Sequence, residues 1–197
     1  MRTYKSTARL RNTVGVTRRA FVWRAWMLAT LLMAMVVPAT TVKAASAIEY
    51  AIKGTYLFKF GAFVEWPKTV FASAESPLVI GILGEDPFGS DLDQSLKNQT
   101  VEGRQVVLMR FKRVEQARDA QILFIGHDTL QPRENILADL RGRSVLTVTD
   151  KSSQRGGIIT FLLRDNKVRF EIDVNAADQA GLKISSKLIN LAVAANK

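Results

Sequence analysis

The sequence predicts an α/β domain of three layers, in which a mainly parallel sheet is flanked by helices and carries an added antiparallel hairpin. Two observations predict the layers: short runs rich in valine, isoleucine and leucine recur along the chain, and helical or turn-rich segments separate them. Strands that are covered on both faces have such runs, and crossover helices provide the cover. A third observation, strict alternation of apolar and polar residues near the C-terminus, predicts the hairpin.

The first part of the domain is expected to alternate strands and helices. Ser90 can cap a helix that runs to Lys97, and Pro132 suits the first turn of a helix that Gly142 ends. The order strand, helix, strand is typical of parallel crossover units. The four apolar runs that we expect as parallel strands are residues 78–83, 105–111, 121–125 and 144–149.

The predicted hairpin has arms at 157–163 and 167–174, joined by the polar turn Arg164-Asp165-Asn166. In the second arm apolar residues alternate with polar ones, so one face is expected to be buried while the other meets water or a protein partner. The polar face carries Arg169, Glu171 and Asp173.

A helix is expected at each end of the domain. The first covers 47–66, and the last begins at Ser185 or Ser186 and ends near Ala194, after a short strand at 182–184. The first helix has two apolar stripes about 120° apart at the helical spacing of 100° per residue. A helix that is apolar over so much of its circumference is either buried between two layers of the domain or packed against another chain, and the sequence leaves both open. The stripe expected to face the core consists of Ile48, Ile52, Tyr56, Phe60 and Phe63, and the second consists of Tyr50, Leu57 and Val64 with Phe58 at its flank.

Residues 1–44 have the composition of an export signal. They carry eight basic residues and no acidic one, an apolar run at 25–37, and small residues near Ala44 where a signal peptidase could cut. A retained membrane anchor is the alternative, but a spanning helix needs about 18 consecutive apolar residues. We therefore expect a cleaved signal at 1–44 and a single periplasmic domain at 45–197, with no membrane insertion after cleavage. The pair Arg18-Arg19 leaves both the Sec and the twin-arginine routes open.

Removal of this signal changes the charge of the protein. The whole chain has a net charge of +10, which by itself would suggest nucleic acid or an anionic membrane as partner. The remaining domain has 20 basic and 18 acidic residues. We therefore expect no nucleic-acid partner.

No catalytic arrangement is recognisable in the sequence. His127 is the only histidine and cysteine is absent, so a zinc cluster of the usual kind and a thiolate nucleophile are excluded. No G-x-S-x-G elbow accompanies the histidine, and the glycines at 81–89 fit no phosphate-binding motif. We expect a protein that is not an enzyme and has no cofactor and no metal.

Acidic residues follow three of the predicted strands. In an open parallel sheet the carboxyl ends of the strands converge on the crevice where ligands bind, so a solute or a cation could bind there. The alternative is that these carboxylates cap the helices and turns that follow the strands. The crevice candidates are Glu85, Asp86, Asp128 and Asp150.

Several motifs in order along the chain resemble the YfiR family of periplasmic proteins. They are 56–67 (YLFKFGAFVEWP), 81–89 (GILGEDPFG), 121–126 (QILFIG), 145–150 (VLTVTD), 156–161 (GGIITF), 169–172 (RFEI) and 180–189 (AGLKISSKLI). The resemblance implies an exported α/β homodimer that represses an inner-membrane diguanylate cyclase. It would bind the cyclase's periplasmic sensor portion, which lowers cyclic-di-GMP and biofilm formation.

Two functions follow from these expectations. In the first, the domain is a non-enzymatic regulator that contacts the cyclase through the polar face of the hairpin and the second stripe of the first helix. The partner-binding candidates are Arg169, Glu171, Asp173, Tyr50, Leu57, Phe58 and Val64. In the second, the domain senses a small ligand at the acidic crevice.

Overall fold

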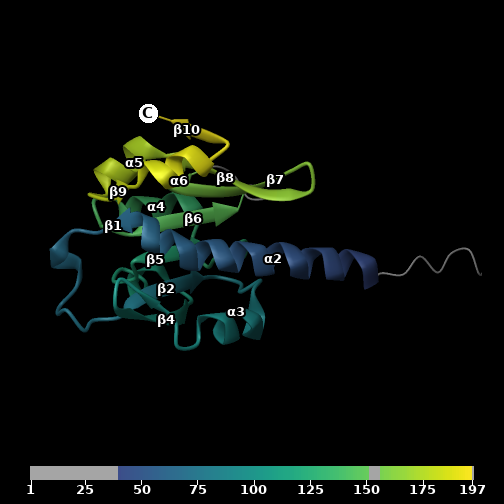
Figure 1. Ribbon diagram of the computed structural model, residues 1–197, viewed down its shortest axis with the longest axis horizontal. Coiled ribbons are helices and arrows are strands. Elements are labelled where there is room, and N and C mark those ends of the chain that lie inside the picture. Colours follow the sequence, from purple (N-terminus) through teal and green to yellow (C-terminus); the bar gives the residue numbers. More distant parts are fainter. Residues whose placement is uncertain (1–39, 151–155, 197) are drawn as a thin grey trace, which may run out of the picture. The chain divides into compact units, whose positions relative to one another are not determined.

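Figure 1 shows the computed structural model, which describes residues 40–150 and 156–196. The chain divides into two units, Met1–Lys43 and Ala44–Lys197, and the second contains nearly all of the described residues. The predicted export signal at 1–44 therefore lies almost wholly outside the described residues. Within them, no helix is both long enough and apolar enough to cross a membrane.

A mixed sheet of eight strands forms the centre of the second unit. Its middle strands run parallel in the order β4-β2-β5-β6-β7, and β8 pairs antiparallel with β7. The short strands β10 and β3 complete the two edges, and β1 pairs with β9 in a separate two-stranded sheet. The strands are β1 (Val64–Glu65), β2 (Leu78–Leu83), β3 (Thr100–Val101), β4 (Arg104–Phe111), β5 (Ile122–Ile125), β6 (Leu146–Asp150), β7 (Ile159–Arg164), β8 (Lys167–Asp173), β9 (Lys183–Ile184) and β10 (Ala194–Asn196).

Helices cover both faces of the sheet, because successive residues of each buried strand point to opposite sides. On one side Ile80 and Phe124 pack with α2 and α3, and on the other Leu83 and Leu123 pack with α4 and the turn η3. The predicted α/β class, with a mainly parallel sheet between helices and an added antiparallel hairpin, is confirmed. The helices are α2 (Thr40–Phe60), α3 (Gly89–Leu96), α4 (Arg133–Leu140), α5 (Val174–Gln179) and α6 (Ser186–Leu191), and the 3-10 turns are η1 (Gly61–Phe63), η2 (Lys68–Val70) and η3 (Val114–Gln116).

Helix α2 runs antiparallel to the central strands (Figure 1). Its middle lies at the carboxyl end of β6, where Lys53 contacts Asp150, and its C-terminal end reaches the start of β2. The prediction of one helix over 47–66 is wrong at the C-terminal end, because α2 ends at Phe60 and the chain continues through η1 into β1. Glycine favours a helix end, and a Cβ at Gly61 would lie only 3.3 Å from the side chain of Val101.

The structure corrects the roles predicted for part of both apolar stripes, although Phe60 of the first stripe is buried as predicted. Leu57 and Val64, expected at a partner contact, are buried in the core. Ile48 and Ile52, expected in the core, are 64% and 42% exposed. The buried face is centred on Lys53, which lies between the two stripes on the helical wheel, so neither stripe faces the sheet squarely.

Two local predictions differ at the ends of elements. The Asp86 carboxylate accepts hydrogen bonds from two backbone N–H groups, at 2.8 and 3.2 Å, so Asp86 rather than Ser90 supports the start of α3. The last helix ends at Leu191 rather than near Ala194, because the chain then extends and pairs with β8 as β10.

The hairpin turn explains why its two strands pair as they do. β7 and β8 remain paired up to Arg164 opposite Lys167, and the two residues between them, Asp165 and Asn166, have φ values of 52° and 56°. Two consecutive residues of positive φ make a two-residue turn whose twist matches that of the flanking strands. Asparagine and aspartate tolerate this conformation better than most residues do.

Because Leu57 is buried and Ile48 is exposed, replacing each by alanine should affect stability very differently. Leu57→Ala should lower the free energy of unfolding by about 2–5 kcal/mol, because it leaves a cavity in the core. Ile48→Ala, on the exposed side of the same helix, should change it by less than about 0.5 kcal/mol. Urea unfolding of both variants measures the difference, and equal losses would show that the faces of α2 are assigned wrongly.

Candidate functional site

A buried lysine lies at the centre of the contact between α2 and the sheet. The Lys53 side chain is 1% exposed, and its ammonium donates to the carboxylates of Glu49 and Asp150. It lies 4.5 Å from the centroid of the Tyr50 ring, whose hydroxyl donates to Asp150 at 3.5 Å. We call these four side chains the Lys53 cluster. It joins the middle of α2 to the carboxyl end of β6.

The environment of the Lys53 cluster raises the pKa of both Lys53 and Tyr50. Burial acts to lower the pKa of Lys53, but hydrogen bonds to Asp150 and Glu49 and the attraction of both carboxylates outweigh it, so the pKa is raised. Burial raises the pKa of Tyr50, and the carboxylates add to this while Lys53 opposes it. The lysine is therefore charged and the tyrosine neutral. This arrangement holds two elements together and is not suited to proton transfer near pH 7.

Reasoning from apolar residues alone misses Lys53. Its spacing from Leu57 and Phe60, at i, i+4 and i+7, places it on the buried face of the helix. A lysine in such a place needs a carboxylate, and Glu49 stands one turn earlier. The sequence therefore contains half of the cluster. The other half, Asp150, lies 97 residues along the chain from Lys53, and no local pattern connects the two.

The four carboxylates predicted at the acidic crevice do not act together. Asp150 belongs to the Lys53 cluster, and Asp86 supports the start of α3 and pairs with the guanidinium of Arg110 at 2.7 Å. Glu85 and Asp128 are exposed. A cavity of about 310 Å³ lies at this edge of the sheet, but Glu85 is the single member of the four that lines it.

The chemistry at this edge is correspondingly limited. His127 is exposed after β5 and lines the same cavity as Glu85. Across residues 40–150 and 156–196, no group of three histidine, cysteine or acidic residues is placed to hold a metal ion. Two of the four carboxylates have the roles of the alternative: Asp86 supports a helix start and pairs with Arg110, and Asp150 pairs with Lys53.

The partner-binding candidates on the hairpin remain near the surface. Arg169 is exposed and Glu171 is half-buried, as the alternation along β8 predicts. Asp173 has a structural task, because its carboxylate accepts a hydrogen bond from the N–H of Ala176 at 2.9 Å and caps α5. Of these three residues, Arg169 is the most accessible to a partner.

The candidates on the first helix are corrected by the structure. Leu57 and Val64 are 0% and 2% exposed and pack in the core, so a partner cannot reach them on the folded domain. Tyr50 and Phe58 are half-buried and remain accessible. The error follows from the position of the buried face, which lies between the two stripes rather than on the first.

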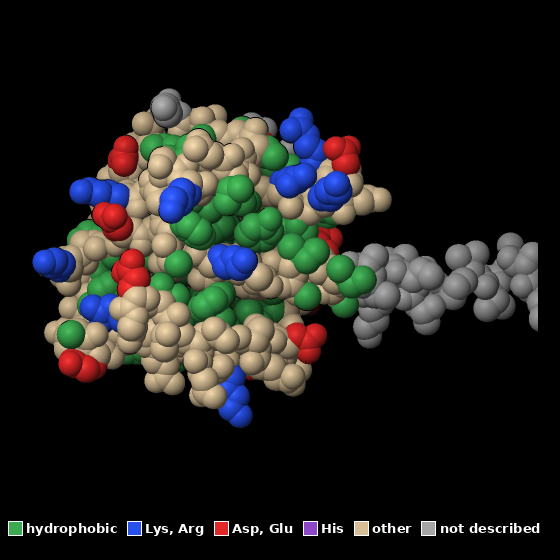
Figure 2. Space-filling model, viewed as in Figure 1, with side chains coloured by type: hydrophobic (Ala, Val, Ile, Leu, Met, Phe, Trp, Pro, Cys, Tyr) green, Lys and Arg blue, Asp and Glu red, His purple; other side chains and the backbone are tan. Residues whose placement is uncertain are grey.

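An apolar strip instead lies along the side of α2 that faces the hairpin. Ile48 and Ile52 are mostly or partly exposed there, Tyr56 is half-buried, and Leu163 of β7 is 52% exposed. We call these four residues the α2 strip. Figure 2 shows apolar surface along this part of the molecule, with basic side chains gathered above it. Contiguous exposed apolar surface marks interaction sites, whereas single exposed apolar residues do not.

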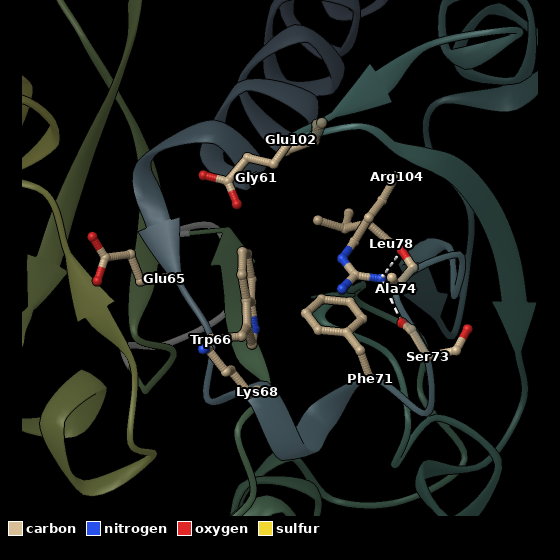
Figure 3. A pocket seen from close by; sticks show the side chains of 11 residues that line it. Gly61, Glu65, Trp66, Lys68, Phe71, Ser73, Ala74, Leu78, Glu102 and Arg104 are labelled. Carbon is tan, nitrogen blue, oxygen red and sulfur yellow. Dashed lines mark hydrogen bonds between the residues drawn. The ribbon is translucent and has the colours of Figure 1, made fainter.

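A second cavity, of about 470 Å³, lies near the C-terminal end of α2 and the β3–β4 hairpin (Figure 3). Trp66 forms one wall, and Phe71 forms the other with the Arg104 guanidinium 3.9 Å from its ring centroid. The Glu102 carboxylate extends above Trp66. We call this cavity the aromatic slot. Its apolar walls and mixed charges suit a flat solute. No pattern in the sequence predicts this slot.

The loop that forms one wall of the aromatic slot is held by a single cation. Arg104 donates from Nη1 to the backbone carbonyls of Ser73, Ala74 and Ser76 at 3.0, 2.9 and 2.8 Å. Across the slot, Nε1 of Trp66 is buried and has no hydrogen-bond partner in the described part of the chain. One wall of the slot is therefore held by the hydrogen bonds of Arg104, whereas the indole N–H of Trp66 on the other wall makes none in the described part of the chain.

These features define the protein as a small α/β domain that presents an apolar strip and a solute-sized slot on a core held by a buried ion pair. A sequence model of the YfiR/HmsC-like family matches residues 50–193, which is most of the chain, so the protein belongs to the YfiR/HmsC-like family. No curated protein matches the chain. The family suggests a periplasmic, non-catalytic regulator of diguanylate cyclase signalling.

The Lys53 cluster predicts a strong and non-additive mutational effect. Lys53→Met should lower the free energy of unfolding by about 3–5 kcal/mol, because it removes the buried ammonium that donates to the Glu49 and Asp150 carboxylates. Adding Asp150→Asn should recover part of this loss, since one of the two carboxylate charges is then removed. Urea unfolding of the two single variants and the double variant measures the coupling. Strictly additive losses would contradict a direct ion pair.

Proposed function

We propose that this protein is a non-enzymatic periplasmic regulator that binds the periplasmic sensor portion of an inner-membrane diguanylate cyclase and represses it. Repression would lower cyclic-di-GMP and biofilm formation. The single observation that carries the proposal is the family match over residues 50–193, which includes the hairpin, every described strand except β10, and the C-terminal half of α2. A homodimer is part of the proposal, because the resemblance in sequence implies one.

The mechanism in this proposal is a shift in the partner's conformational equilibrium. A protein in the periplasm has no access to cytoplasmic nucleotides, so an effect on cyclic-di-GMP must pass through a protein that spans the membrane. A regulator that binds the inactive form more tightly than the active form shifts the population by its difference in affinity. The accessible candidates Arg169, Glu171, Tyr50 and Phe58 are the residues proposed to contribute to this binding.

The proposal predicts that the exported protein lowers cyclic-di-GMP only from outside the cytoplasm. Deletion of the gene should raise cellular cyclic-di-GMP, and the full chain supplied in trans should restore it. A matched variant without residues 1–44 should fail to restore it, because its product stays in the cytoplasm. Mass spectrometry of nucleotide extracts measures the level. Restoration by the leaderless variant, or no change on deletion, would contradict the proposal.

The aromatic slot favours a second candidate function, a small-ligand sensor. The predicted crevice does not assemble, but the slot of about 470 Å³ has the size of a solute site. Flat apolar groups fit between Trp66 and Phe71, and polar substituents would meet the side chains of Glu102, Lys68 or Glu65 at its margin.

A thermal-shift screen of flat aromatic solutes tests this second function. A solute at a hundredfold excess over its Kd stabilises the folded state by about 2.7 kcal/mol, which raises the Tm visibly. Phe71→Ala should abolish the response, whereas His127→Ala, at the other end of the sheet, should leave it intact. If no solute raises the Tm, or if both variants respond like the wild type, the slot is not a sensor site.

A further inference from the structure

The tip of the β7–β8 hairpin extends past its neighbour in the sheet. β6 ends at Asp150 opposite Phe161, whereas β7 and β8 continue to Arg164 opposite Lys167. Figure 1 shows this tip on the same side of the domain as the N-terminal half of α2. Among the described strands only β7 and β8 form this tip, which we call the arm.

Measured along the direction of the strands, the exposed apolar residues of the arm and of the helix lie at similar positions. The Tyr56 ring lies 6.1 Å from that of Phe161, which fixes the two elements side by side. From there Ile52 is one helical turn, about 6 Å, toward the end of the strands. Leu163 is two strand residues, about 6.6 Å, in the same direction and on the same face as Phe161. The α2 strip is thus continuous across two elements.

The other face of the arm is mainly basic at its tip, and Glu171 follows two residues beyond Arg169 on the same face. Arg164, Lys167 and Arg169 are exposed and share this face, with Arg164 directly opposite Lys167. No described carboxylate lies within ion-pair distance of any of the three. Like charges directly opposite each other destabilise a hairpin, so folding provides no reason for this arrangement. An anionic partner would provide one.

We propose that the α2 strip and the basic face of the arm form one docking surface for an acidic amphipathic segment of a protein partner. This inference rests on the proposed function in that the partner is the cyclase's periplasmic portion. Apolar side chains of the segment pack against Ile48, Ile52 and Leu163. Its carboxylates pair with Arg164, Lys167 and Arg169, whose long side chains reach the margin of the strip from an arm only two strands wide. The net charge of the remaining domain is small, so the attraction is local to this arm.

A protein segment fits this surface better than a lipid bilayer does. The apolar residues lie on the inner side of the arm, between it and the helix, and the cations lie on its outer side. A flat membrane surface cannot meet both at once, whereas a segment that follows the strip and turns at the arm can. Charge pairing of this kind mainly sets which partner binds and how fast it associates.

Site-specific photocrosslinking and charge reversal test the docking surface. The photoreactive amino acid p-benzoylphenylalanine replaces Ile52 or Leu163 in the full exported chain, and Lys112, exposed after β4, is the control position. Crosslinks to a membrane protein should form at the first two positions and not at the third, and the adduct peptide should be acidic with apolar residues. Lys167→Glu/Arg169→Glu should reduce the crosslinked yield by about tenfold. Lys97→Glu/Lys112→Glu, with the same change in charge, should not.

The outcomes separate this inference from the proposed function. A crosslinked acidic protein that is not a cyclase supports the docking surface and contradicts the cyclase as partner. A cyclase that co-purifies with the wild type and with the Lys167→Glu/Arg169→Glu variant equally supports the function and overturns the docking surface. Absence of crosslinks at both positions overturns it as well. So does binding of the protein to phosphatidylglycerol vesicles that the charge reversal abolishes, because the surface then serves a membrane.

Discussion

The ion pair between Lys53 and Asp150 is the constraint on which the arrangement of the domain depends. A lysine ammonium is too costly to bury alone, so α2 can lie on the sheet only where carboxylates meet it. Glu49 comes with the helix, and Asp150 comes from the end of β6. This requirement fixes the rotation of α2 about its axis. It buries Leu57 and leaves Ile48 and Ile52 at the surface.

A second anchor of a different kind holds the last two turns of the helix. Tyr56 and Phe60 pack on Phe161 and Phe170 of the hairpin, with ring centroids 5.3 to 6.1 Å apart. Such pairs contribute about 0.5–1.5 kcal/mol each beyond the area they bury. Electrostatic pairing at its middle and aromatic packing in its last two turns prevent the helix from sliding or turning. The arm beside it therefore keeps a fixed distance from the helix residues of the α2 strip.

The sequence was sufficient to predict the strands of the sheet but not which side of α2 is exposed, and the reason is physical. A run such as Leu78–Leu83 must be buried on both faces, so its strand could be predicted to the residue. The hairpin followed from strict alternation and a turn that tolerates positive φ. The rotation of α2 about its axis could not be predicted, because a helical wheel that considers only apolar residues assigns no role to Lys53. Its partner Asp150 is known only once β6 and α2 have been placed together.

The aromatic slot could not be predicted for a related reason. Trp66, Phe71 and Arg104 belong to three separate segments, and none of them has the periodicity of a helix or strand contact. Their meeting depends on the end of α2 at Phe60 and on the carbonyl groups that Arg104 happens to face. Family resemblance filled part of this gap by indicating a regulatory role, but it carries no geometry for the slot or for the arm.

The large sequence separation between Lys53 and Asp150 also affects when the chain can fold. Its two charged partners stand 97 residues apart, and α2 comes first in the domain while β6 is made much later. Contacts between distant segments form slowly, because the entropy of closing a long loop must be overcome before they are made. A helix whose lysine finds its carboxylate only late leaves the emerging chain unfolded for longer. Such a delay would suit the Sec route among the two export routes considered for this chain, because that route carries chains across the membrane before they fold.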